Sequence, residues 1–158
     1  MNQNETQWDK ILKIKTTGRD DSHSDQYRYP YEPTSYMVLE RLANSGLIRK
    51  NNTLVDYGTG KGRVCFYLSY QTRCKTIGIE YDERIYQAAV DNQKTAVSGA
   101  KTEFVPVRAE EYEVPIEVNR FYFMGYESTA GYLLLSKFGC YFLTDPRYSE
   151  EAQASVKG

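Results

Sequence analysis

The chain has 158 residues, a length that fits one domain, and its composition of 41% hydrophobic and 26% charged residues is that of a globular protein. Its 20 basic and 21 acidic residues give a net charge of −1. This balance weighs against the basic footprint of proteins that bind nucleic acids or membrane surfaces.

The histidine and cysteine residues do not indicate a metal site or a disulfide framework. The single histidine, His23, excludes a histidine-rich metal site, and the three cysteines, Cys65, Cys74 and Cys140, show no CxxC spacing. We expect reduced thiols and no metal. The polar amino terminus lacks the apolar core of a signal peptide, and no apolar run reaches membrane-spanning length. These features predict a cytoplasmic protein without membrane contact.

The first third of the chain predicts two short helices separated by a long loop. Apolar residues at helical spacing indicate an amphipathic helix over 5–15, and the Gly-, Ser-, Asp- and Pro-containing segment 16–33 indicates an irregular loop. Residues 1–33 together form a candidate lid. Thr34 is a candidate N-cap for a helix over 35–45, which Gly46 would end.

Strands and helices then alternate, which favours an α/β fold with a parallel sheet. A solvated tail over 146–158 would follow the domain over 34–145. We expect strands over 53–57, 75–80, 102–107, 119–124 and 140–144, and helices over 62–71, 83–97 (capped by Asp82) and 129–138.

A glycine-rich turn joins the first predicted strand to its helix. Asp56 lies near the end of the strand, and Gly58 and Gly60 lack a Cβ, so the chain can turn tightly and a ligand can approach the backbone. The following helix presents free N–H groups that favour an anionic group. The carboxylate of Asp56 can engage the amino group of a bound zwitterion.

Two nucleotide-binding motifs fail at this turn. A dinucleotide fingerprint needs glycine at position 63, which is Arg63, so a dehydrogenase-like domain is disfavoured. A phosphate-binding P-loop needs Gly-Lys-Ser/Thr, but Lys61 precedes Gly62 here. We expect Lys61 and Arg63 to face solvent in the first helical turn.

The segment Val55-Asp56-Tyr57-Gly58-Thr59-Gly60-Lys61-Gly62 resembles motif I of the class I S-adenosylmethionine-dependent methyltransferases. The resemblance covers about residues 30–124. It implies a Rossmann-like three-layer sandwich with a mostly parallel sheet, incomplete relative to the family's seven strands. It also implies S-adenosyl-L-methionine as cofactor.

The resemblance assigns roles to single residues. Glu80, at the end of the second strand, would accept hydrogen bonds from both ribose hydroxyls, and Tyr81 would pack on adenine. Arg108 stands where relatives have an acid or amide, so adenine would instead use the backbone at Ala109 or the Glu110 carboxylate. The full predicted cofactor set is Tyr31, Thr34, Asp56, Tyr57, Gly58, Thr59, Gly60, Gly62, Glu80, Tyr81, Ala109 and Glu110.

The acceptor side of the site is not matched. Relatives carry an Asn-Pro-Pro-aromatic type of box after the fourth strand, whereas this chain has Phe123-Met124-Gly125-Tyr126-Glu127-Ser128. We expect a methyltransferase with an unidentified acceptor, a small molecule or protein rather than a nucleic acid, and assign no catalytic residue. The alternative is a truncated, catalytically impaired protein that holds the cofactor and self-associates through an exposed sheet edge.

Overall fold

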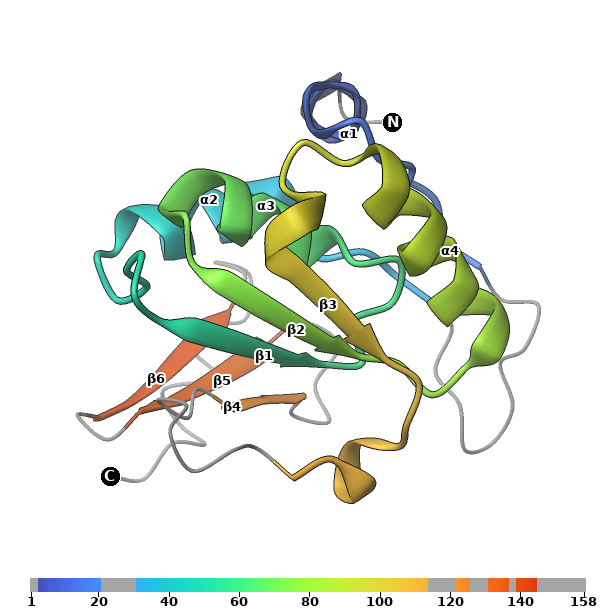
Figure 1. The fold of residues 1–158 in the computed structure, drawn as a ribbon. Helices are drawn as coiled ribbons and strands as arrows, with labels where there is room; N and C mark the ends of the chain where they lie inside the picture. Colours follow the sequence, from blue (N-terminus) through green and yellow to red (C-terminus); the bar gives the residue numbers. More distant parts are fainter. Residues whose placement is uncertain (1–2, 21–30, 114–121, 126–130, 137–138, 145–158) are drawn as a thin grey trace.

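A computed structural model of the chain, drawn in Figure 1, describes residues 3–20, 31–113, 122–125, 131–136 and 139–144. The order of elements is that of an α/β protein, followed by a segment of strands only. The elements are α1 (Gln3–Leu12), α2 (Tyr36–Asn44), β1 (Thr53–Tyr57), α3 (Arg63–Thr72), β2 (Lys75–Ile79), α4 (Glu83–Thr95), the 3-10 helices η1 (Gly99–Lys101) and η2 (Ala109–Glu111), β3 (Thr102–Val105), β4 (Tyr122–Gly125), β5 (Gly131–Ser136) and β6 (Gly139–Thr144).

The first sheet is parallel, with the order β1-β2-β3. Two β–α–β crossovers through α3 and α4 build it, and Figure 1 shows both helices on the same face. The carboxyl ends of all three strands therefore meet at one edge, where open α/β sheets bind their ligands. The predicted strand over 102–107 ends at Val105, directly before Pro106, which cannot donate a ladder hydrogen bond.

The amino-terminal helix α1 belongs to the same core as α2 and α3. The Trp8 ring meets the Tyr67 ring edge-on with centroids 5.0 Å apart, and Tyr36 lies 5.3 Å from Tyr67. Leu12 is fully buried, and Ile14 nearly so. The aromatic and aliphatic side chains of α1 thus hold the start of the chain against α3.

Two details of the predicted elements are wrong. The N-cap of α2 is Ser35, whose hydroxyl accepts a hydrogen bond from the Met37 N–H, rather than Thr34. The segment predicted as a helix over 129–138 contains β5, because a short apolar run such as Tyr132–Leu135 does not distinguish helix from strand by its periodicity. The cap predicted at Asp82 is confirmed, since its carboxylate accepts from the N–H groups of Arg84 and Ile85.

The later strands form a second sheet, with the order β4-β5-β6 and antiparallel pairing throughout. β4 runs close to β1, and no ladder joins the two sheets among the described residues. The α/β fold and the incomplete parallel sheet are confirmed, with three parallel strands in place of the five strands expected. The predicted tail over 146–158 lies outside the described residues.

Within the described part of the chain, no helix is long and apolar enough to cross a membrane. Among the same residues, no group of three or more His, Cys, Asp or Glu side chains is placed to hold a metal ion. Cys65 and Cys74 are buried free thiols.

Candidate cofactor site at the carboxyl edge of the parallel sheet

The glycine-rich turn lies between β1 and α3 and takes left-handed backbone conformations. Gly58, Gly60 and Gly62 have φ values of 72°, 58° and 87°, which L-residues with a Cβ rarely adopt. The N–H groups of Gly58 and Thr59 both donate to the carbonyl of Ile79 at 2.9 and 3.0 Å. This pair of bonds fixes the turn to the end of β2.

The glycines differ in what surrounds them. A Cβ at Gly58 would meet no atom within 4 Å, so open space lies beside its backbone. A Cβ at Gly60 would lie 2.4 Å from Cε2 of Tyr31, and one at Gly62 would lie 2.7 Å from the rings of Phe66 and Phe104. Gly62 is therefore needed for packing, whereas Gly58 leaves room for a ligand.

Asp56 is a buried carboxylate without a full set of partners. It is 6% exposed, and its Oδ2 is the one buried side-chain oxygen or nitrogen without a hydrogen bond in the described part of the structure. Burial raises the pKa of Asp56 to about 7, opposed by a hydrogen bond from Thr59 and reinforced by the negative charge of Glu80. A buried acceptor of this kind is costly unless a donor or cation satisfies it.

Glu80 lies across the turn from Asp56 and organises its backbone. Its Oε2 accepts from the Gly60 N–H and its Oε1 from the Asp82 N–H, both at 2.9 Å. Burial raises the pKa of Glu80 above its ordinary value, although these two backbone donors act to lower it. Each carboxylate oxygen has a second acceptor position, so Glu80 can still receive two hydroxyl donors.

Thr59 and Tyr57 complete the turn through packing. Thr59 is buried, and its hydroxyl lies 3.4 Å from the sulfur of Cys65. The Tyr57 ring meets the Tyr112 ring edge-on with centroids 6.3 Å apart. Tyr57 and Thr59 both lie at the glycine turn, and their described contacts are with other side chains of the protein.

The residues predicted to hold adenine lie beyond Glu80. Tyr81 is exposed, and the guanidinium of Arg108 lies 4.3 Å from its ring centroid. One Arg108 N–H group also donates to the Tyr81 hydroxyl at 3.3 Å. Ala109 and Glu110 begin the 3-10 helix η2, and the Glu110 side chain lies outside the described part of the structure. A base stacked on Tyr81 would therefore share the ring with Arg108.

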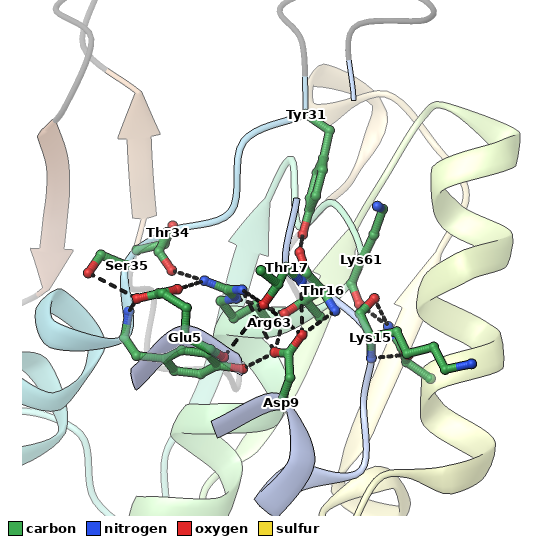
Figure 2. A network of polar contacts seen from close by, with 12 residues as sticks. Glu5, Asp9, Lys15, Thr16, Thr17, Tyr31, Thr34, Ser35, Lys61 and Arg63 are labelled. Carbon is green, nitrogen blue, oxygen red and sulfur yellow. Dashed lines mark hydrogen bonds and ion pairs between the residues drawn. The ribbon is translucent and has the colours of Figure 1, made fainter. Parts of the chain in front are cut away.

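Tyr31, a predicted cofactor residue, lies against the glycine turn. Its ring lies against Gly60, its hydroxyl donates to the carbonyl of Thr16 at 2.7 Å, and the Lys61 ammonium lies 4.5 Å from its ring centroid. Thr34 is not brought to the turn in the same way. Its carbonyl accepts from Arg63 at 3.1 Å, so Thr34 belongs to the network drawn in Figure 2.

The prediction that Arg63 faces solvent is wrong. Arg63 is 2% exposed, and its guanidinium forms ion pairs with Glu5 and Asp9 of α1. It also donates to the hydroxyls of Thr16 and Thr17, at 2.7 and 3.0 Å. The sequence shows that Arg63 directly follows the glycine turn. Its partners, however, lie 29 to 58 residues away in sequence, so no local pattern predicts its burial.

Asn92 is a second polar residue that the sequence does not single out. This buried residue of α4 donates to the carbonyls of Lys15 and Lys61, at 3.3 and 3.0 Å, and accepts from the Lys15 N–H at 2.8 Å. These bonds join the amino-terminal segment to the glycine turn. Asn92 thus restrains the carbonyl between Gly60 and Gly62.

No family model of known protein families matches the chain, and no curated protein matches it in sequence. Solved structures do match. An S-adenosylmethionine-dependent methyltransferase from Thiobacillus denitrificans, crystallised with S-adenosyl-L-homocysteine, has a TM-score of 0.51 and 16% identity over 60% of this chain. The matched part of the chain shares the fold of this methyltransferase.

A second solved structure is an RNA methyltransferase from Salinibacter ruber, also in complex with S-adenosyl-L-homocysteine. It has a TM-score of 0.49 and 26% identity over 51% of this chain. The chain covers 53% of that protein and 38% of the Thiobacillus protein, so it spans about half or less of their lengths. The Thiobacillus match confirms the predicted resemblance at the level of the fold, over 60% of this chain.

Proposed function

We propose that the chain binds S-adenosyl-L-methionine at the carboxyl edge of β1 and β2 and acts as a methyltransferase. The observation that carries this proposal is the unpartnered, buried Oδ2 of Asp56, two residues before Gly58, beside which the glycine turn leaves open space. A cofactor with an ammonium group supplies the missing partner, and its approach needs a residue without a Cβ.

The residues present fit the other parts of this cofactor. Glu80 is held by the Gly60 and Asp82 N–H groups with acceptor positions to spare, which suits a pair of ribose hydroxyls. The exposed ring of Tyr81 offers a stacking surface for adenine. Arg63 fills the position of the third glycine in the dinucleotide fingerprint with a large buried side chain, which supports this cofactor over NAD.

When bound, the cofactor supplies a sulfonium-linked methyl group that is already electrophilic. The protein then has to hold the donor and exclude water, because orientation is the main requirement of an in-line transfer. Asp56 would hold the amino group and Glu80 the ribose. We assign no general base, since residues 126–130, where relatives carry their acceptor motif, lie outside the described residues.

For the acceptor we propose a small molecule or a protein, on the near-zero net charge of −1. We also propose a cytoplasmic location. A second candidate is a protein that binds the cofactor without turnover and associates with another copy. The antiparallel order β4-β5-β6, in place of further parallel strands, favours it.

Calorimetric titration with S-adenosyl-L-homocysteine and with NAD tests the cofactor assignment. We expect saturable binding of the first and none of the second; the reverse result, or no heat with either, contradicts the proposal. Incubation with methyl-labelled cofactor and a cell extract then separates the two candidates. Label transferred to a component of the extract supports the enzyme, and binding without transfer supports the second candidate.

A further inference from the structure

We infer that Arg63 is a positioning residue that couples the amino-terminal segment to cofactor binding. The inference rests on the proposed function and concerns the same site. Arg63 donates to the hydroxyls of Thr16 and Thr17, and the Thr16 carbonyl accepts from the Tyr31 hydroxyl (Figure 2). The Tyr31 ring in turn lies against Gly60 of the glycine turn. Order in residues 5–17 would therefore determine how well the turn is prepared for its ligand.

The charge of Arg63 explains why the segment stays in place. Arg63 is the first residue of α3, and the positive end of a helix dipole disfavours a cation there. Its two carboxylate partners, Glu5 and Asp9, both come from α1. Since a buried cation needs its counter-charges, α1 must remain against the turn.

Asp9 transmits this restraint to the residues that follow α1. Its carboxylate accepts from the N–H groups of Thr16 and Thr17 at 2.7 and 2.8 Å, and from the Tyr36 hydroxyl. Burial acts to raise the pKa of Asp9, but these hydrogen bonds outweigh it and hold the pKa below its ordinary value. Asp9 is therefore ionised at neutral pH, and its bonds fix the Thr16 carbonyl that receives the Tyr31 hydroxyl.

The link to the turn ends on Tyr31. The carbonyl of Thr16 lies 2.7 Å from the Tyr31 hydroxyl, and the ring occupies the side of Gly60 that a Cβ would need. On the other side, the Gly60 N–H donates to Glu80. Tyr31 and Glu80 thus restrain the same residue, so loosening the network around Arg63 would disturb the Gly60–Glu80 bond.

Two mild variants of the full chain test the coupling. Glu5→Gln removes one counter-charge of Arg63 with little change in size, and Tyr31→Phe removes the bond to Thr16 while keeping the ring. We expect both to bind S-adenosyl-L-homocysteine about threefold to tenfold more weakly, because a smaller fraction of the protein is competent to bind. We also expect faster hydrogen exchange at the Thr16 and Thr17 amides in Glu5→Gln.

Ile48→Val is the control for general loss of stability, since Ile48 is a core residue with no part in the network. It should bind with wild-type affinity. The inference is overturned if either test variant binds the ligand as tightly as the wild type does, or if Ile48→Val weakens binding as much as the test variants do. The proposed function still stands in both cases, provided that the wild-type protein binds the ligand. If the wild-type protein itself fails to bind the ligand, both fail.

Discussion

Two charged side chains lie on either side of the glycine turn, and they are satisfied to very different degrees. All three guanidinium nitrogens of Arg63 have partners, among them two carboxylates and two hydroxyls. Asp56 is also buried, but its Oδ2 has no hydrogen-bond partner. Since an unsatisfied buried group costs stability, the first site builds the structure, whereas the second fits the ligand that we propose.

Removing Arg63 should have the largest effect on stability. In Arg63→Met, Glu5 and Asp9 lose their buried counter-charge, so we expect the free energy of unfolding to fall by about 3–5 kcal/mol. Urea denaturation measures this loss. Lys94→Met is the control, because the Lys94–Asp91 pair is exposed and such pairs contribute about 0–1 kcal/mol. Equal losses in the two variants would show that the Arg63 network adds nothing particular to the fold.

Removing Glu80 should separate ligand binding from folding. Glu80→Ala deletes the acceptors for two ribose hydroxyls, and at about 1.5–3 kcal/mol per charge-assisted bond we expect affinity for S-adenosyl-L-homocysteine to fall at least tenfold. Circular dichroism should show an unchanged fold. Glu83→Ala, three residues further along the chain and exposed on α4, should leave affinity unchanged. A Glu80→Ala protein with wild-type affinity would disprove the ribose assignment.

The sequence locates the glycine turn between β1 and α3 correctly but does not reveal the network around Arg63, for physical reasons. Asp56, Gly58, Gly60 and Glu80 lie at strand ends and in a tight turn, and local chemistry marks such positions within a few residues. Arg63 depends on partners from α1 and from residues 16–34, and only the folded chain brings them together. The helix predicted in place of β5 is wrong for a similar reason, because the periodicity of a short apolar run does not distinguish a helix from a strand.

The protonation of Asp56 should make ligand affinity depend on pH. The pKa of Asp56 is about 7 in the folded protein and 3.8 in the unfolded chain. Between these pH values the folded protein without ligand holds one more proton than the unfolded chain, so its free energy of unfolding falls as the pH rises through this range. A ligand ammonium favours the ionised carboxylate. Binding should therefore strengthen with rising pH, levelling off above about pH 7.

The measurement that tests the account most directly is the affinity for S-adenosyl-L-homocysteine at pH 6 and pH 8, in the wild type and in Asp56→Asn. For one group with a pKa near 7, we expect wild-type affinity to rise about tenfold between these two pH values. Asp56→Asn should bind more weakly at pH 8 and vary little with pH. Wild-type affinity that does not change with pH, or an Asp56→Asn protein that binds as tightly as the wild type at pH 8, would contradict the account.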